Sequence, residues 1–165
     1  MAGLAHLGFG FAAKRFAPKV PLAALLAASE AIEILYVVFF LAGLGGDRAG
    51  YLSHGLFMSV VWTLLAAGAA FIFSRSARTA AIVGLVAFAH WVLDFIVQPM
   101  TAIFPDATGM NVLFEGSPRV GLGLYRWIAA VVIGESTLLL GGILIYVFAL
   151  RKIGREKSAA IEAAR

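Results

Sequence analysis

Four long apolar runs alternate with short polar segments along this chain. The runs cover residues 20–44, 52–73, 79–97 and 125–150, and the shortest of them has 19 residues. At a rise of about 1.5 Å per residue, each run can cross a hydrocarbon core about 30 Å thick. A backbone inside that core must satisfy its own polar groups, so each run is predicted to be a transmembrane helix.

A shorter apolar stretch precedes these runs. Residues 2–17 are too few to cross a bilayer, and Pro18 and Pro21 mark a turn before the first long run. The basic residues Lys14 and Arg15 follow the stretch instead of preceding it, which argues against a signal peptide. We interpret the stretch as a half-span or interfacial helix that folds back along the first long run.

The predicted fold class is therefore all-α: a polytopic membrane four-helix bundle with a short N-terminal half-span or interfacial helix. Residues 1–165 are expected to form a single membrane domain, because neither an internal repeat nor a low-complexity linker divides them. Residues 151–165 are polar, and we expect them to form a helical cytoplasmic tail.

Composition supports a membrane protein and excludes other classes. Hydrophobic residues make up 62% of the chain and charged residues 13%, whereas a soluble domain has about 25% charged residues. The net charge of +4 comes from basic residues that flank the apolar runs, which is typical of topology signals and not of a nucleic-acid surface. Cysteine is absent, so any metal must be held by nitrogen and oxygen atoms.

The basic residues also predict the orientation in the membrane. They cluster before the first long run, between the second and the third, and after the fourth: Lys14, Arg15 and Lys19; Arg75 and Arg78; Arg151, Lys152, Arg155 and Lys157. An even number of spans places all three clusters on one side, which the positive-inside rule makes cytoplasmic. We expect a multi-pass protein of the bacterial inner membrane, with both termini cytoplasmic and residues 100–124 outside.

Ionisable residues lie inside the apolar runs, where they are costly unless they have partners. They are the carboxylates Glu30, Glu33, Asp94 and Glu135 and the imidazoles His54 and His90, and His6 joins them if the first stretch folds back. His90 and Asp94 are four residues apart and Glu30 and Glu33 three apart, so each pair shares one helix face. No Lys or Arg lies deep in a run, so these acids need protons or a bound cation.

This set of donors suits a divalent metal. Zn²⁺ is favoured, with Mn²⁺ and Fe²⁺ as alternatives, and the site can hold one ion or two. The predicted metal ligands are His6, Glu33, His54, His90 and Asp94. Glu135 or Glu30 is predicted to be the general base or to orient a ligand. The alternative for each residue is a hydrogen bond across helices, and Ser53 is interpreted as a cap of the second span.

The order of the short motifs resembles a family, the bacterial membrane-bound metal-dependent hydrolases. The motifs are Ala5-His6-Leu7-Gly8, Ser29-Glu30-Ala31-Ile32-Glu33, Ser53-His54-Gly55-Leu56, His90-Trp91-Val92-Leu93-Asp94 and Gly121-Leu122-Gly123-Leu124, which together extend over nearly the whole chain. The resemblance implies a metal site at His6, Glu33, Ser53, His54, His90 and Asp94. This chain has Glu33 where the family pattern has Asp, and Glu30 where a neutral polar residue is commoner.

The leading functional hypothesis is a metal-dependent hydrolase of the membrane. Its substrate is expected to be a membrane lipid or a lipid-linked or membrane-proximal ester or phosphoester, with no nucleic-acid partner, and a homo-oligomer is left open. One alternative is a proton- or cation-coupled transporter, which should show broken helices or a repeat at its site. The long runs lack interior proline and their halves do not match, which favours the enzyme. A second alternative is a metal-stabilised membrane protein without catalysis.

Overall fold

Helices are the regular secondary structure of the described part of the chain. The computed structural model describes residues 3–100, 103 and 112–164. Within these ranges the only extended pairing is an isolated bridge between Pro99 and Leu122, and no strand forms. The predicted all-α class is confirmed. Residues 101–102 and 104–111 of the predicted outer loop lie outside the described residues.

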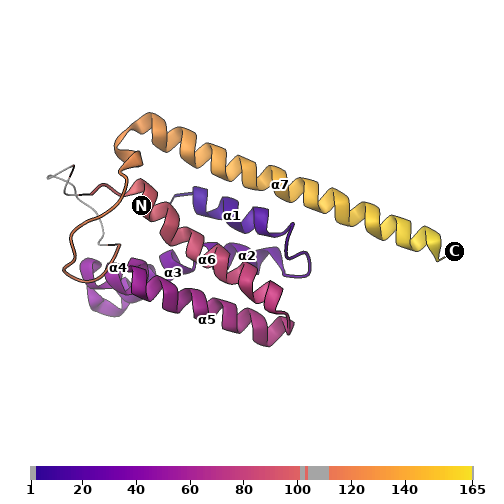
Figure 1. Ribbon diagram of the computed structural model, residues 1–165, viewed down its shortest axis with the longest axis horizontal. Helices are drawn as coiled ribbons and strands as arrows, with labels where there is room; N and C mark the ends of the chain where they lie inside the picture. Colours follow the sequence, from indigo (N-terminus) through magenta and orange to yellow (C-terminus); the bar gives the residue numbers. More distant parts are fainter. Residues whose placement is uncertain (1–2, 101–102, 104–111, 165) are drawn as a thin grey trace.

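Three helices are long and apolar enough to cross a membrane. They are α5 (Leu56–Ser74), α6 (Ala77–Val97) and α7 (Ile128–Ala163). A two-residue turn joins α5 to α6, with Arg75 in the left-handed conformation and the Ser76 hydroxyl accepting from the Thr79 N–H at 3.2 Å. α7 continues beyond the other helices into the polar tail (Figure 1). The length and composition of these helices are consistent with a membrane protein.

The first predicted span differs from a continuous helix. It consists of α2 (Leu22–Ser29) and α3 (Ala31–Phe39), and a turn of π-helix, η1 (Phe40–Leu44), follows α3. The two parts are bent by 61° relative to each other, and together they are apolar enough to form a fourth span. The break lies at Glu30, which has φ −103° and ψ 8°. A carboxylate predicted to lie in the site is therefore the hinge residue.

The N-terminal stretch forms the short helix α1 (Ala5–Ala13), which lies between α7 and α2 (Figure 1). α1 and α7 approach closely at Gly8 and Gly142. A Cβ on Gly8 would meet the backbone of Leu138, and a Cβ on Gly142 would meet the backbone of Gly8. Small residues allow two helix backbones to touch in this way inside a membrane. α1 is thereby packed at the depth of the spans although it is too short to cross a membrane.

The second long run also begins differently from the prediction. Residues Gly46–His54 form a separate helix, α4, and Gly55 is extended before α5 starts at Leu56. Ser53 lies in the last turn of α4, and α5 has no side-chain cap. The interpretation of Ser53 as a cap of the second span is wrong, because the extended Gly55 separates it from that helix. The returning chain at residues 112–124 packs on the C-terminal end of α6, where the Leu122 N–H donates to the Phe95 carbonyl.

Candidate metal centre

The predicted site residues come from five places in the chain and meet inside the bundle. His6 lies in the first turn of α1, His54 is the last residue of α4, and His90 and Asp94 lie on α6. Glu30 lies at the break after α2, and Glu33 in the first turn of α3. His6, His54, His90 and Asp94 are each exposed by 5% or less. The helices therefore bring the six residues together, with four of them buried and with Glu30 and Glu33 partly exposed.

Asp94 is the common neighbour of the three imidazoles. Its Oδ1 lies 3.8 Å from His6 Nε2, and its Oδ2 lies 3.5 Å from His54 Nε2 and 3.6 Å from His90 Nε2. Glu33 Oε2 lies 3.4 Å from His54 Nε2. Hydrogen bonds between nitrogen and oxygen are usually about 2.7–3.2 Å long, so these separations are longer than ordinary hydrogen bonds. Two ligands of one ion at about 2.1 Å lie roughly 3.0–3.5 Å apart, which is close to the observed spacing.

All three imidazoles are held through the same nitrogen. His90 Nδ1 contacts the carbonyl of Ser29 at 2.8 Å, and His6 Nδ1 contacts the carbonyl of Gly3 at 3.2 Å. A carbonyl can only accept, so each of these Nδ1 atoms carries the proton. His54 Nδ1 lies 2.7 Å from the hydroxyl of Ser53, which itself donates to the Ala49 carbonyl at 2.7 Å, so the hydroxyl accepts from His54. Each Nε2 is left with a free lone pair, which is the form that a metal ligand takes.

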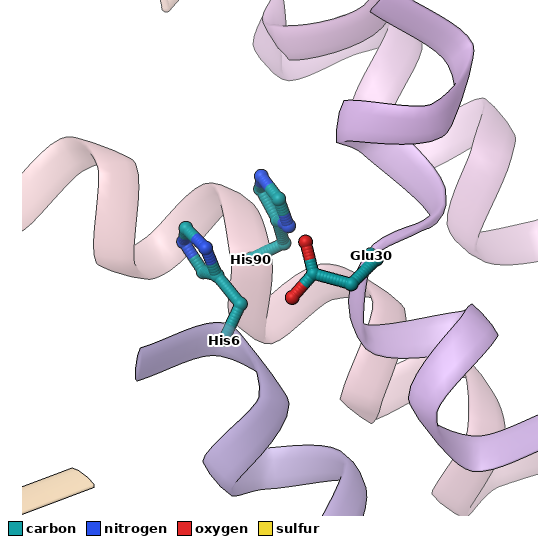
Figure 2. Close-up of side chains that lie close together, drawn as sticks. All are labelled: His6, Glu30 and His90. Carbon is teal, nitrogen blue, oxygen red and sulfur yellow. The ribbon is translucent and has the colours of Figure 1, made fainter. Parts of the chain in front are cut away.

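His6, His90 and Glu30 face one another across the space between three elements (Figure 2). The rings of His6 and His90 are stacked, with centroids 3.7 Å apart and planes inclined by 6°. The carboxylate of Glu30 points toward both rings from the break between α2 and α3 (Figure 2). Stacked imidazoles at this separation favour the neutral state, because two adjacent cations would repel each other.

Several buried polar atoms of the cluster have no hydrogen-bond partner. In the described part of the chain, five buried side-chain atoms are in this state, and four belong to the cluster: His6 Nε2, Glu30 Oε1, His90 Nε2 and Asp94 Oδ2. An unpartnered buried polar group costs roughly 1–3 kcal/mol, and more if it is charged. The donors are nitrogen and oxygen atoms aimed at a shared space, so their chemistry fits a divalent cation.

The donors form two overlapping groups that can each hold an ion. One group is His6, Glu30 and His90, and the other is Glu33, His54 and His90, with the potential ligand atoms of each group within 4.8 Å of one another. Among the described residues, His90 is shared by both groups. Both groups combine imidazole and carboxylate, a donor set that suits Zn²⁺, Mn²⁺ and Fe²⁺. The geometry accommodates one ion or two.

Glu135 is engaged elsewhere. Its Oε2 accepts from the backbone N–H of Ala5 at 2.7 Å, and its Oε1 accepts from the hydroxyl of Tyr125 at 2.7 Å. Burial and the bond to Glu135 raise the pKa of Tyr125, so the hydroxyl remains a donor. Neither group of potential ligands in the described residues contains Glu135. Its carboxylate instead anchors the first residue of α1, directly before His6.

Sequence reasoning missed the groups that orient the imidazoles. The sequence predicts Ser53 to be a cap, and the resemblance implies a place for it in a metal site, whereas its hydroxyl contacts His54 Nδ1. The carbonyls of Gly3 and Ser29 hold the other two imidazoles, and the hydroxyl of Tyr125 holds Glu135. The adjacency of Ser53 and His54 was the available signal for the first contact. A backbone carbonyl leaves no signal in the sequence.

No protein-family model, curated protein or solved structure matches this chain. The resemblance to the bacterial membrane-bound metal-dependent hydrolases therefore stays a prediction from the motifs. What can be said of the site rests on the chain's own geometry.

Proposed function

We propose that this protein is a metal-dependent hydrolase that acts inside a bacterial inner membrane on a lipid-linked or membrane-proximal ester or phosphoester. One observation carries the proposal. His6, His54 and His90 are all held through Nδ1, so that three free Nε2 atoms converge on Asp94 and Glu33. Unrelated structural hydrogen bonds would engage either ring nitrogen, whereas a metal site requires the nitrogen that faces the ion to be free on each imidazole.

The roles follow from the contacts. His6, His54, His90 and Glu33, which belong to the two groups of potential ligands, hold one or two divalent ions, with zinc favoured by the number of imidazoles. Asp94 belongs to neither group, and its role as a further ligand rests on its distances of 3.5–3.8 Å to the three imidazoles. A divalent metal supplies Lewis acidity, which lowers the pKa of water and polarises an ester or phosphoester oxygen. Glu30 is the general base, because its Oε1 is buried, unpartnered and directed at the cluster. Glu135 positions α1 through Ala5.

The placement in the membrane supports a lipid substrate. The cluster is built between helices that are long and apolar enough to span the bilayer, so molecules of the bilayer have the shortest path to it. The α1–α2 and α5–α6 turns, which carry two of the basic clusters, lie at the same end of the molecule (Figure 1). With the positive-inside rule, this arrangement supports a cytoplasmic location for these two turns and for the C-terminal end of α7. The start of α1 lies at the opposite end of that helix, away from the two turns, so the proposed cytoplasmic N-terminus gains no support from it (Figure 1).

The first test is the metal content of detergent-purified protein. We expect a fixed metal stoichiometry in the wild type and a loss of at least tenfold in affinity for His90→Ala and Asp94→Asn. Asp47→Asn is the matched control, because Asp47 is an exposed acid on α4. Equal metal content in the wild type and the two ligand variants would refute the metal centre.

The second test is hydrolysis of lipids by the metal-loaded protein. A total lipid extract is incubated with the wild type and with Glu30→Gln, and the released fatty acids, phosphate and headgroups are identified. We expect turnover by the wild type and a loss of roughly 10²- to 10⁴-fold for Glu30→Gln at unchanged metal content. A metal-loaded protein that releases none of these products would leave the third hypothesis, a metal-stabilised membrane protein without catalysis.

A second candidate function is cation transport, which the broken span favours. A bent pair of helices with a carboxylate at the break is typical of transporter sites. The lack of interior proline predicts continuous spans, which counts against this function, and the bend at Glu30 removes that argument. The mismatch between the two halves of the chain still counts against it. Uptake of zinc or manganese into sealed proteoliposomes separates the two functions, because a hydrolase does not accumulate the ion.

A further inference from the structure

A large cleft lies away from the metal centre, between α2, α5 and the beginning of α6. Its volume is about 1000 Å³. Small side chains face each other across it, with Ala24, Ala27 and Ala31 on one wall and Ala66 and Ala69 on the other. Alanine leaves the space open because it has no side chain beyond Cβ. This volume lies at the upper end of the range for pockets that bind drug-sized molecules.

The lining of the cleft is complementary to an anionic amphiphile. Its walls are mainly apolar, and Lys19 and Arg78 lie at its edge with exposed side chains. No acidic residue lines it. Lys19 comes from the turn before α2 and Arg78 from the first turn of α6, so two separate segments bring positive charge to the same edge. An apolar space beside the hydrocarbon core is filled by acyl chains in preference to water.

We propose that this cleft holds a phospholipid with an anionic headgroup, with its acyl chains between α2 and α5 and its phosphate at Lys19 and Arg78. Both ends of the molecule are matched, since the alanine walls accept the chains and the two cations accept the phosphate. Basic residues at the membrane surface attract anionic lipids in general. Lys19 and Arg78 differ from an isolated basic residue because they lie beside a groove that can hold acyl chains.

The bound lipid is a resident and not the substrate of the metal centre. Arg78 and His90 are twelve residues apart on α6, which corresponds to about 18 Å along the helix. A phosphate held at Arg78 is therefore far from the imidazoles. The lipid replaces the side chains that α2 and α5 lack where they face each other, and so it holds the first half of the broken span against the bundle. This inference does not depend on the proposed hydrolase activity.

The test is native mass spectrometry of the detergent-purified full chain with added phosphatidylglycerol or phosphatidylcholine. We expect one phosphatidylglycerol per chain, retained in preference to phosphatidylcholine. Lys19→Ala with Arg78→Ala should weaken phosphatidylglycerol binding by about fivefold for each residue removed. The matched control, Lys152→Ala with Arg155→Ala, removes the same charge from the exposed tail and should bind like the wild type.

A second pair of variants tests the groove itself. Ala27→Phe fills the space from α2 and should lower the occupancy of both lipids, whereas Leu64→Phe on the exposed face of α5 should not. The proposal is overturned if the two lipids bind equally, if Lys19→Ala with Arg78→Ala binds like its control, or if Ala27→Phe changes nothing. It is also overturned if cysteines at Ala69 crosslink two chains, since a second copy then fills the cleft.

Discussion

Glu135 offers the sharpest test of how this site is built, because two roles predict opposite results. As a general base, Glu135 would lose turnover on replacement by Gln but would leave the metal in place. In the structure both of its carboxylate oxygens are engaged, one by the Ala5 N–H and one by the Tyr125 hydroxyl. If Glu135 is an anchor of α1, Glu135→Gln should largely keep the metal affinity and Glu135→Ala should lose it.

The size of the effect follows from these two bonds. A hydrogen bond to a charged group contributes about 1.5–3 kcal/mol, and Glu135 is partly buried, so the lower value applies to each bond. Glu135→Ala then removes about 3 kcal/mol of hydrogen-bond free energy. If all of that free energy serves to hold His6 beside His90, its loss lowers the metal affinity roughly 100-fold. In Glu135→Gln the amide oxygen accepts from Ala5 and the amide nitrogen donates to Tyr125, so the loss should be about tenfold or less.

Metal affinity is measured by competition with a chelator on purified protein, with thermal unfolding as the check that each variant folds. Tyr125→Phe removes one of the two hydrogen bonds, so its metal affinity should lie between those of Glu135→Gln and Glu135→Ala. Wild-type affinity in Glu135→Ala would refute the anchoring role. Glu135→Gln that keeps the metal and loses turnover would restore the general base that the sequence suggested.

Three further predictions follow from the described contacts. Ser53→Ala should lower metal affinity by about tenfold, less than His54→Ala, because it removes the acceptor of His54 Nδ1 and not a ligand; wild-type affinity would show that Ser53 does not orient the ring. Gly142→Ala should destabilise the protein by about 1–3 kcal/mol in chemical unfolding because its Cβ meets the backbone of Gly8, whereas Gly141→Ala has open space and should not. A cysteine at the exposed Glu115 should react with an impermeant maleimide from outside the cell and one at Ser158 only after lysis; the reverse pattern would invert the topology.

Local signals in the sequence predicted three of the four spans and the convergence of the histidines and acids, whereas their binding of a metal stays a prediction. Apolar runs longer than 18 residues identify α5, α6 and α7 directly. The spacing of His90 and Asp94 places them on one helix face, and they do lie 3.6 Å apart. Carboxylates inside a span need a partner from another helix, and the structure brings both Glu33 and Asp94 to the imidazole of His54.

The break in the first span was not predictable from the local sequence. No proline or glycine lies near Glu30, and the segment is rich in good helix formers such as Ala and Leu. The contacts at the break include one that is distant in sequence, since His90 Nδ1 donates to the carbonyl of Ser29 from 61 residues away. A side chain inserted at a helix carbonyl is a recognised cause of sharp kinks. The contact between Glu135 and Ala5 was not predictable for the same reason, because the two residues are 130 positions apart.

The way the imidazoles are held has a consequence for how this site can vary in evolution. Two of the three acceptors are backbone carbonyls, at Gly3 and Ser29, and a carbonyl survives any amino-acid replacement. The carbonyl at position 29 therefore survives replacement, although the buried Ser29 side chain beside Gly10 leaves room only for a small residue there. Position 53 must keep a hydroxyl that can accept from His54. Position 3 is restricted for a different reason, since a Cβ there would displace the Glu135 carboxylate from its hydrogen bonds to Ala5 and Tyr125. Homologous chains that keep the three histidines should accordingly have a small residue at 29, Ser or Thr at 53 and Gly at 3.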